Sequence, residues 1–113
     1  MDKIKNDDYY IDKILESIGI IEKVYNGKTI IDLENDIYIN NTVLFQLIII
    51  AEYARRISDE YKNNKNSIPW HKINGLRNIA VHNYDRVRYD VIDDTIKEDL
   101  QILKKELSKW NTM

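Results

Sequence analysis

Apolar side chains recur at intervals of three and four residues along most of this 113-residue chain, and this spacing constrains the fold more than any other feature. The first run includes Ile11, Ile14, Ile18 and Tyr25 and ends at Asn26–Gly27, a pair typical of the end of a helix. Such spacing puts the apolar groups on one face of an α-helix. We therefore expect a helix over residues 8–26.

The next run is longer and more apolar. Val43, Leu47, Ile50 and Ala54 belong to a 3-4 repeat that predicts a second helix over residues 41–63. Other apolar residues widen this surface beyond a single stripe, namely Leu44, Ile48, Ile49 and Ala51. Because a small bundle covers only one stripe of a helix, this breadth indicates burial between two copies of the chain.

Two further patterns complete the chain. Pro69 fits the first turn of a helix without losing a hydrogen bond, and a third helix is expected over residues 69–83, weakened or kinked at Gly75. A fourth helix is expected over residues 89–110, since aspartates at its start and lysines near its end complement the helix dipole. Residues 28–40 are mixed, with a short helical turn expected at 29–33.

Composition agrees with an all-helical chain. Three glycines and one proline are too few for the turns of a β-sandwich or barrel. The sequence predicts one all-α domain over residues 1–113, an up-and-down bundle of four main helices that forms a homodimer. The apolar stretch over residues 43–51 is far shorter than a membrane span, and the charged N-terminus lacks a signal-peptide core. We expect a cytoplasmic protein that binds no membrane.

Charge is distributed unevenly. The net charge is −2, which argues against strong attraction of the whole molecule to nucleic acid. Between Tyr53 and Arg88, however, eight basic residues face three acidic ones, a local charge of +5. A phosphate-bearing ligand can therefore bind at the centre of the chain while both ends stay acidic.

Few residues can perform chemistry. His71 and His82 are the only histidines, neither has a carboxylate at a common ligand spacing, and the chain has no cysteine. The glycine-rich phosphate loop and the serine elbow are also missing from the sequence. We expect neither a metal ion nor a cofactor.

One short segment combines groups suited to metal-free phosphodiester cleavage. Arg77 can bind phosphate oxygens as a fork, and His82 can exchange a proton near neutral pH. On a regular helix these two side chains diverge by roughly 140°. They meet at one phosphate only if the helix ends near His82 or if a second copy supplies the missing partner.

Each of these residues also has a simpler interpretation. His82 can complement the dipole at a helix C-terminus, and Tyr84 can be a packing aromatic. Glu52 lies inside the apolar run, where burial without a partner would be costly. Glu52 therefore either faces solvent or meets a cation, for which Arg77 is a candidate.

The segment 68–78, running into residues 82–84 and then 91–100, resembles the HepT toxins. These are minimal HEPN-domain ribonucleases encoded beside an MNT-type nucleotidyltransferase antitoxin. The resemblance covers roughly residues 41–107 and rests on Ile-Pro-Trp, Gly-Leu-Arg-Asn and His-x-Tyr motifs. The N-terminal helix matches only in length and pattern.

The resemblance implies a helical homodimer whose two motifs line one cleft and cleave RNA without a metal ion. Arg77 would hold the scissile phosphate, and His82 would act as general acid or base. Asn78 would orient His82 or contact the RNA backbone. Tyr84 matches the tyrosine to which the antitoxin attaches AMP. The basic window adds candidate RNA contacts, which are Arg55, Arg56, Lys72, Arg86 and Arg88.

Two other hypotheses remain open. A non-catalytic helical module would bind RNA, nucleotide or a partner protein through the same cleft, with no proton transfer by His82. A helical dimer would use the motif only to cap and pack its helices. Stable RNA binding without product distinguishes the first hypothesis from a nuclease. For the second, alanine at Arg77 or His82 should lower the melting temperature and leave the effect on cellular growth unchanged.

Overall fold

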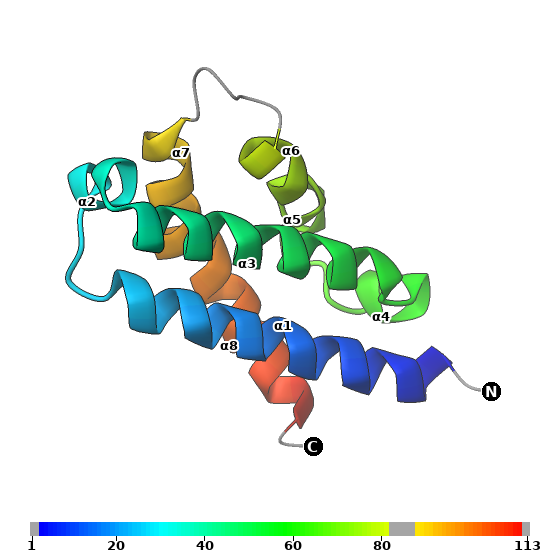
Figure 1. Cartoon of the computed structure of the whole chain (residues 1–113). Helices are drawn as coiled ribbons and strands as arrows, with labels where there is room; N and C mark the ends of the chain where they lie inside the picture. The colour runs from blue at the N-terminus through cyan, green and yellow to red at the C-terminus, as the bar shows by residue number, and fades with distance from the viewer. Residues whose placement is uncertain (1–2, 82–87, 112–113) are drawn as a thin grey trace.

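A computed structural model describes residues 3–81 and 88–111, and this part of the chain is helical without strands. The prediction of an all-α fold is thereby confirmed. The elements, labelled in Figure 1, are α1 (Lys3–Tyr25), α2 (Ile30–Asn35), α3 (Ile37–Arg56), α4 (Asp59–Asn63), α5 (Trp70–Asn74), α6 (Leu76–Val81), α7 (Tyr89–Asp94), the π-helical turn η1 (Thr95–Asp99) and α8 (Leu100–Asn111).

The long helices are arranged as an antiparallel pair crossed by a third. α1 and α3 run side by side in opposite directions, and the continuous α7–η1–α8 segment crosses behind them (Figure 1). The short helices α5 and α6 pack on α3. The predicted helix over residues 89–110 therefore exists, with a π-helical turn in its middle.

The predicted helix over residues 41–63 is wrong in its bounds. α3 begins earlier, at Ile37, and ends at Arg56, after which the chain turns and α4 starts. The corner is fixed from α1: the buried Asp7 carboxylate accepts hydrogen bonds from the Ser58 amide (2.8 Å) and hydroxyl (2.7 Å). Ser58 in turn caps α4 by accepting from the Tyr61 amide. This contact is remote in sequence, so local spacing could not reveal the break.

The mixed segment over residues 28–40 forms α2 and the start of α3. Gly27 adopts a positive φ of 72° after α1, as a helix-ending glycine does. Thr29 and Asp32 then form a capping box at α2, and Asp36 caps α3 by accepting from the amides of Tyr38 and Ile39. The short helical turn expected at 29–33 is present as α2.

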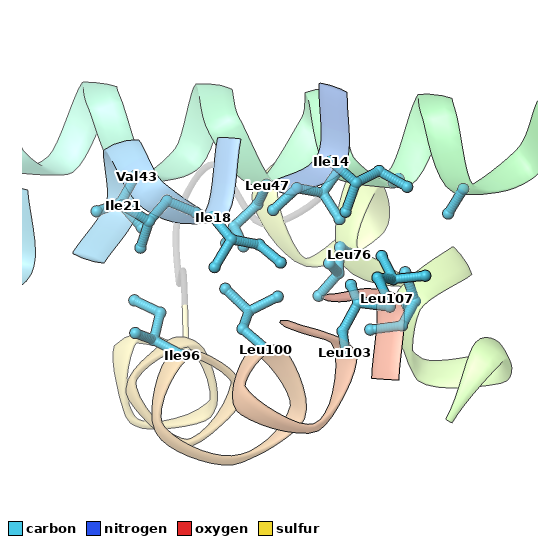
Figure 2. Close-up of a cluster of buried hydrophobic side chains, with 14 of the residues drawn as sticks. Ile14, Ile18, Ile21, Val43, Leu47, Leu76, Ile96, Leu100, Leu103 and Leu107 are labelled. Carbon is cyan, nitrogen blue, oxygen red and sulfur yellow. The ribbon is translucent and has the colours of Figure 1, made fainter. Parts of the chain in front are cut away.

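The core lies where α1, α3 and α8 meet, with Leu76 of α6 beside them (Figure 2). Most of its side chains are those that the 3-4 spacing predicts. Fully buried examples drawn in Figure 2 are Ile14, Ile18, Ile21, Val43, Leu47, Leu76, Leu100, Leu103 and Leu107.

Replacing Leu103 with alanine is expected to lower the free energy of unfolding by about 2–5 kcal/mol, because it leaves a cavity in a fully buried site. Its neighbour Ile102 is 42% exposed, so Ile102→Ala serves as the matched control and should cost less than about 1 kcal/mol. Urea denaturation at one fixed protein concentration measures both. Equal losses for the two variants would contradict the assigned core.

α3 is apolar on both of its faces. The face away from the core carries a second 3-4 repeat, here called the outer stripe, formed by Tyr38, Asn41, Phe45, Ile48, Ile49 and Glu52. Tyr38 is 81% exposed and Phe45 is 59% exposed. Among the described helices, α3 is the one long and apolar enough to cross a membrane by length and composition, with 33% of that window buried. Core packing therefore accounts for one face of α3 and leaves Tyr38 and Phe45 of the outer stripe exposed.

Candidate functional site

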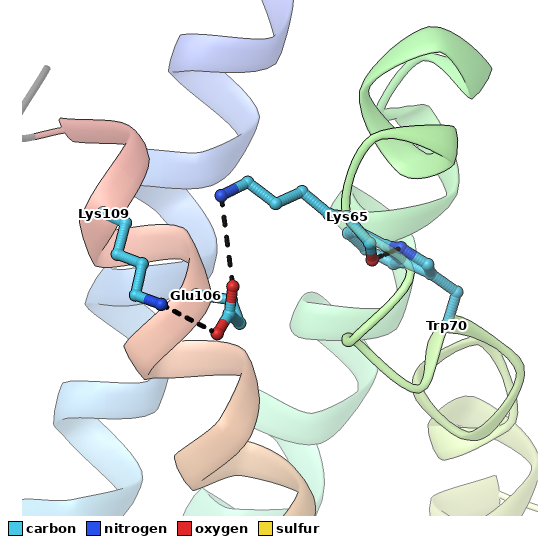
Figure 3. Close-up of polar contacts among 4 residues, drawn as sticks. All are labelled: Lys65, Trp70, Glu106 and Lys109. Atoms are coloured by element: carbon cyan, nitrogen blue, oxygen red, sulfur yellow. Dashed lines mark hydrogen bonds and ion pairs between the residues drawn. The ribbon is translucent and has the colours of Figure 1, made fainter.

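The segment that leads into the candidate site is anchored by Trp70. Its indole Nε1 donates to the carbonyl oxygen of Lys65 (3.1 Å), and its ring meets Tyr61 edge to face. Lys65 also pairs with Glu106 of α8 (4.0 Å), which receives a hydrogen bond from Lys109 (Figure 3). The Lys109 hydrogen bond is the main reason that the pKa of Glu106 lies below its usual value. The start of α5 is thus held against both α4 and α8.

Gly75 divides the predicted helix over residues 69–83 into α5 and α6, so the kink expected there is confirmed. Its φ of −82° is open to any residue, and an added Cβ would lie 3.5 Å from the nearest backbone oxygen. Ile73 on one side and Leu76 on the other are buried and anchor the two short helices. This anchoring leaves Arg77 and Asn78 exposed on α6.

Arg77 meets a carboxylate on α3. Its Nε lies 3.5 Å from Oε2 of Glu52. The other oxygen of the same carboxylate, Oε1, accepts a hydrogen bond from Nη1 of Arg55 (3.4 Å). The expectation that Glu52 meets a cation, with Arg77 as a candidate, is therefore confirmed. The structure adds Arg55, one turn further along α3, which the sequence analysis did not connect with Arg77.

This arrangement can bind an anion. Two guanidinium groups share one carboxylate, which leaves one positive charge in the cluster. The side chains of Arg77 and Arg55 are 50% and 63% exposed, so a phosphate can reach both. We call Glu52, Arg55 and Arg77 the arginine cluster.

Two further candidate RNA contacts have partners outside this cluster. Arg56 stacks on the ring of Tyr53, with its guanidinium carbon 5.4 Å from the ring centroid. Lys72 lies 3.9 Å from Asp99 of η1. Both side chains are exposed, and their contacts with RNA stay predictions.

Arg88 is held at the start of α7. It binds Asp90 through two nitrogens, at 3.1 and 2.9 Å, and these hydrogen bonds lower the pKa of the Asp90 carboxyl. Both side chains are exposed, and solvent screens their attraction. The Arg88 candidate contact is therefore available to a ligand that displaces Asp90.

Three candidate residues lie outside the described residues, namely His82, Tyr84 and Arg86. They belong to the segment that joins α6 to α7. The pairing of Arg77 with His82 therefore stays a prediction. Within residues 3–81 and 88–111, no group of three or more metal-ligating side chains is close enough to hold a metal ion.

Fold and site together define an all-helical protein with an exposed arginine cluster at the start of an Arg-x4-His-x-Tyr motif. A family model described as "Ribonuclease HepT-like" matches residues 14–110, which is a wider range than the motifs alone cover. This chain belongs to the HepT-like ribonuclease family.

Individual relatives carry related names. The "Probable ribonuclease HepT" of Thermococcus cleftensis is 30% identical over 88% of this chain and 91% of its own length. The "Putative RNase TTE0752" of Caldanaerobacter subterraneus is 25% identical over 88% of this chain and 89% of its own. A "Gamma-glutamylcyclotransferase and putative RNase" of Methanocaldococcus jannaschii is 30% identical over 88% of this chain. The match covers only 45% of that relative's own length. No solved structure matches the chain.

Proposed function

We propose that this chain is the toxin of a HEPN/MNT-type toxin–antitoxin module, a cytoplasmic endoribonuclease that cleaves RNA without a metal ion. The arginine cluster carries the proposal. Arg77 is solvent-accessible at the first position of the Arg-x4-His motif and lies beside a second guanidinium, in a chain of a ribonuclease family.

The proposed reaction is an intramolecular transfer at phosphorus. The 2′-oxygen of a ribose attacks the adjacent phosphorus while His82, or a second histidine from the partner copy, accepts the 2′-hydroxyl proton. The bond to the 5′-oxygen breaks, and that oxygen receives a proton as it leaves from the other of these two imidazoles, which starts in its protonated form. Arg77 stabilises the charge that develops on the phosphate oxygens. The products carry a 2′,3′-cyclic phosphate and a 5′-hydroxyl, and no redox step is involved.

A homodimer completes the proposed site. Arg77 and His82 diverge on a regular helix, so two copies that face one another can pool them around one phosphate. The outer stripe of α3 supports this assembly, because Tyr38 and Phe45 expose large apolar groups and the stripe reaches Glu52 of the arginine cluster. Asn78, exposed on α6, would orient His82 or bind the RNA backbone.

The direct test incubates the purified protein with RNA in EDTA. Discrete fragments ending in 2′,3′-cyclic phosphate are expected. Retention of intact RNA in a stable complex would instead support the alternative function, a non-catalytic module that binds RNA, nucleotide or a partner through this cleft. If the protein neither binds nor cleaves RNA, the result would contradict both the nuclease and the RNA-binding module.

We further propose that an MNT-type nucleotidyltransferase neutralises the toxin by transferring AMP to Tyr84. The added phosphate groups would compete with RNA for Arg77 and occupy the cleft. Incubation with that enzyme, ATP and magnesium should raise the mass of the chain by one or more AMP units and abolish RNA cleavage. Tyr84→Phe should prevent the mass increase. Tyr38→Phe, which removes the hydroxyl of an exposed tyrosine of α3, should leave the mass increase unchanged. Labelling that persists in Tyr84→Phe would refute the assignment.

A further inference from the structure

Glu52 is the charged residue of the outer stripe. Its neighbours one turn earlier, Ile48 and Ile49, are half-buried and apolar, whereas Glu52 places a carboxylate between α3 and α6. Both of its oxygens are used, one by Arg77 of α6 and the other by Arg55 of its own helix. Glu52 therefore links the helix that bears the proposed catalytic arginine to the helix that bears the outer stripe.

Folding stability does not explain this arrangement. The Glu52 side chain is 36% exposed and that of Arg77 is 50% exposed, and ion pairs this accessible add little to stability because solvent screens them. The packing of α6 on α3 rests instead on buried apolar groups such as Leu76 and Leu47. The carboxylate instead favours one direction of a long, flexible guanidinium, since its Oε2 lies 3.5 Å from Nε of Arg77.

The atoms in contact favour an orienting role. Glu52 approaches Arg77 most closely at Nε, the nitrogen nearest the chain. A guanidinium has five N–H groups, and four of them are on the two Nη nitrogens. An arginine held through Nε can therefore still present an Nη fork to a phosphate.

We infer that Glu52 is a positioning residue that orients the Arg77 guanidinium for the scissile phosphate. This inference rests on the proposed ribonuclease function. Because Glu52 acts on Arg77 rather than on RNA, its loss affects the chemical step more than substrate binding. Misplacement of a catalytic group by about 1 Å can reduce a rate by 10²-fold, which sets the expected scale.

The test compares Glu52→Gln with Glu16→Gln as a matched control. Glu16 is an exposed glutamate of α1 that pairs with Lys13 at the same helical spacing as the Glu52–Arg55 pair. Glu52→Gln should lower kcat by about 10- to 100-fold and change KM by less than about threefold, with an unchanged melting temperature. Arg55→Ala should instead raise KM, since Arg55 would contact RNA directly. Glu16→Gln should match the wild type.

A second measurement does not depend on activity. In ¹⁵N-labelled protein, the Nε–Hε signal of Arg77, assigned by its loss in Arg77→Lys, should show restricted motion in the wild type and fast motion in Glu52→Gln. A wild-type kcat in Glu52→Gln, or an Arg77 signal equally mobile in both proteins, would overturn the positioning role. An inactive wild type with a restricted Arg77 signal would overturn the ribonuclease function and leave the orienting contact established.

Discussion

Replacing Arg77 with alanine should lower kcat for RNA cleavage in EDTA by about 10²–10³-fold. Mutational removal of a single donor that stabilises charge in a transition state has effects of this size. Arg77 is half exposed and its ion pair with Glu52 is solvent-accessible, so the melting temperature should change little. His82→Ala should lower kcat by about 10²–10⁴-fold, as expected for loss of a general acid or base.

The matched control is Lys104→Ala. Lys104 is an exposed cation of α8 that pairs with Glu22 of α1 at 2.9 Å, so this substitution also removes a positive charge and one cross-helix ion pair. Its kcat should equal that of the wild type. Initial rates on a fluorescent oligoribonucleotide, measured on proteins shown to have equal oligomeric state, give all three values. Wild-type rates for both Arg77→Ala and His82→Ala would refute the site.

The hydrophobic pattern determines most of the core because burial depends on which face of a helix a residue occupies. Ile14, Leu47 and Ile50 lie on the apolar faces that the 3-4 spacing predicts, and each is fully buried. Corners are less visible in a sequence. The turn after α3 is fixed by Asp7 contacting Ser58, and no local pattern predicts a hydrogen bond between residues 51 positions apart.

The candidate site was predicted to a different extent. A carboxylate within an apolar run must either face solvent or meet a cation, and Arg77 is one candidate cation; the structure pairs Glu52 with it. The local excess of basic residues, in contrast, does not indicate in which direction each basic side chain points. Lys72 faces η1 and Arg56 stacks on Tyr53, because these side chains follow the faces of their own helices. The charge count alone therefore does not tell which basic side chains lie around one site.

The outer stripe of α3 yields the second large expected effect. Phe45 lies near the middle of α3 and is 59% exposed. The helix has an acidic cap, Asp36, at its start and two arginines, Arg55 and Arg56, at its end. If two copies pack antiparallel about a two-fold axis, the acidic end of one α3 lies near the basic end of the other. Phe45 of each copy would then be buried close to the axis, where a large aromatic group contributes most to association.

Phe45→Glu should therefore weaken the dimer by about 30-fold or more, equivalent to about 2 kcal/mol, because it removes an aromatic anchor and places two like charges near the axis. Sedimentation over a range of concentrations measures the dissociation constant. Because the proposed site needs both copies, cleavage per chain should fall on dilution of this variant and recover at high concentration. Ile102→Glu, which adds the same charge at an exposed apolar position of α8, should leave both properties unchanged. A monomeric but fully active wild type would refute the shared cleft, since one copy would then suffice to bring its own imidazole to Arg77.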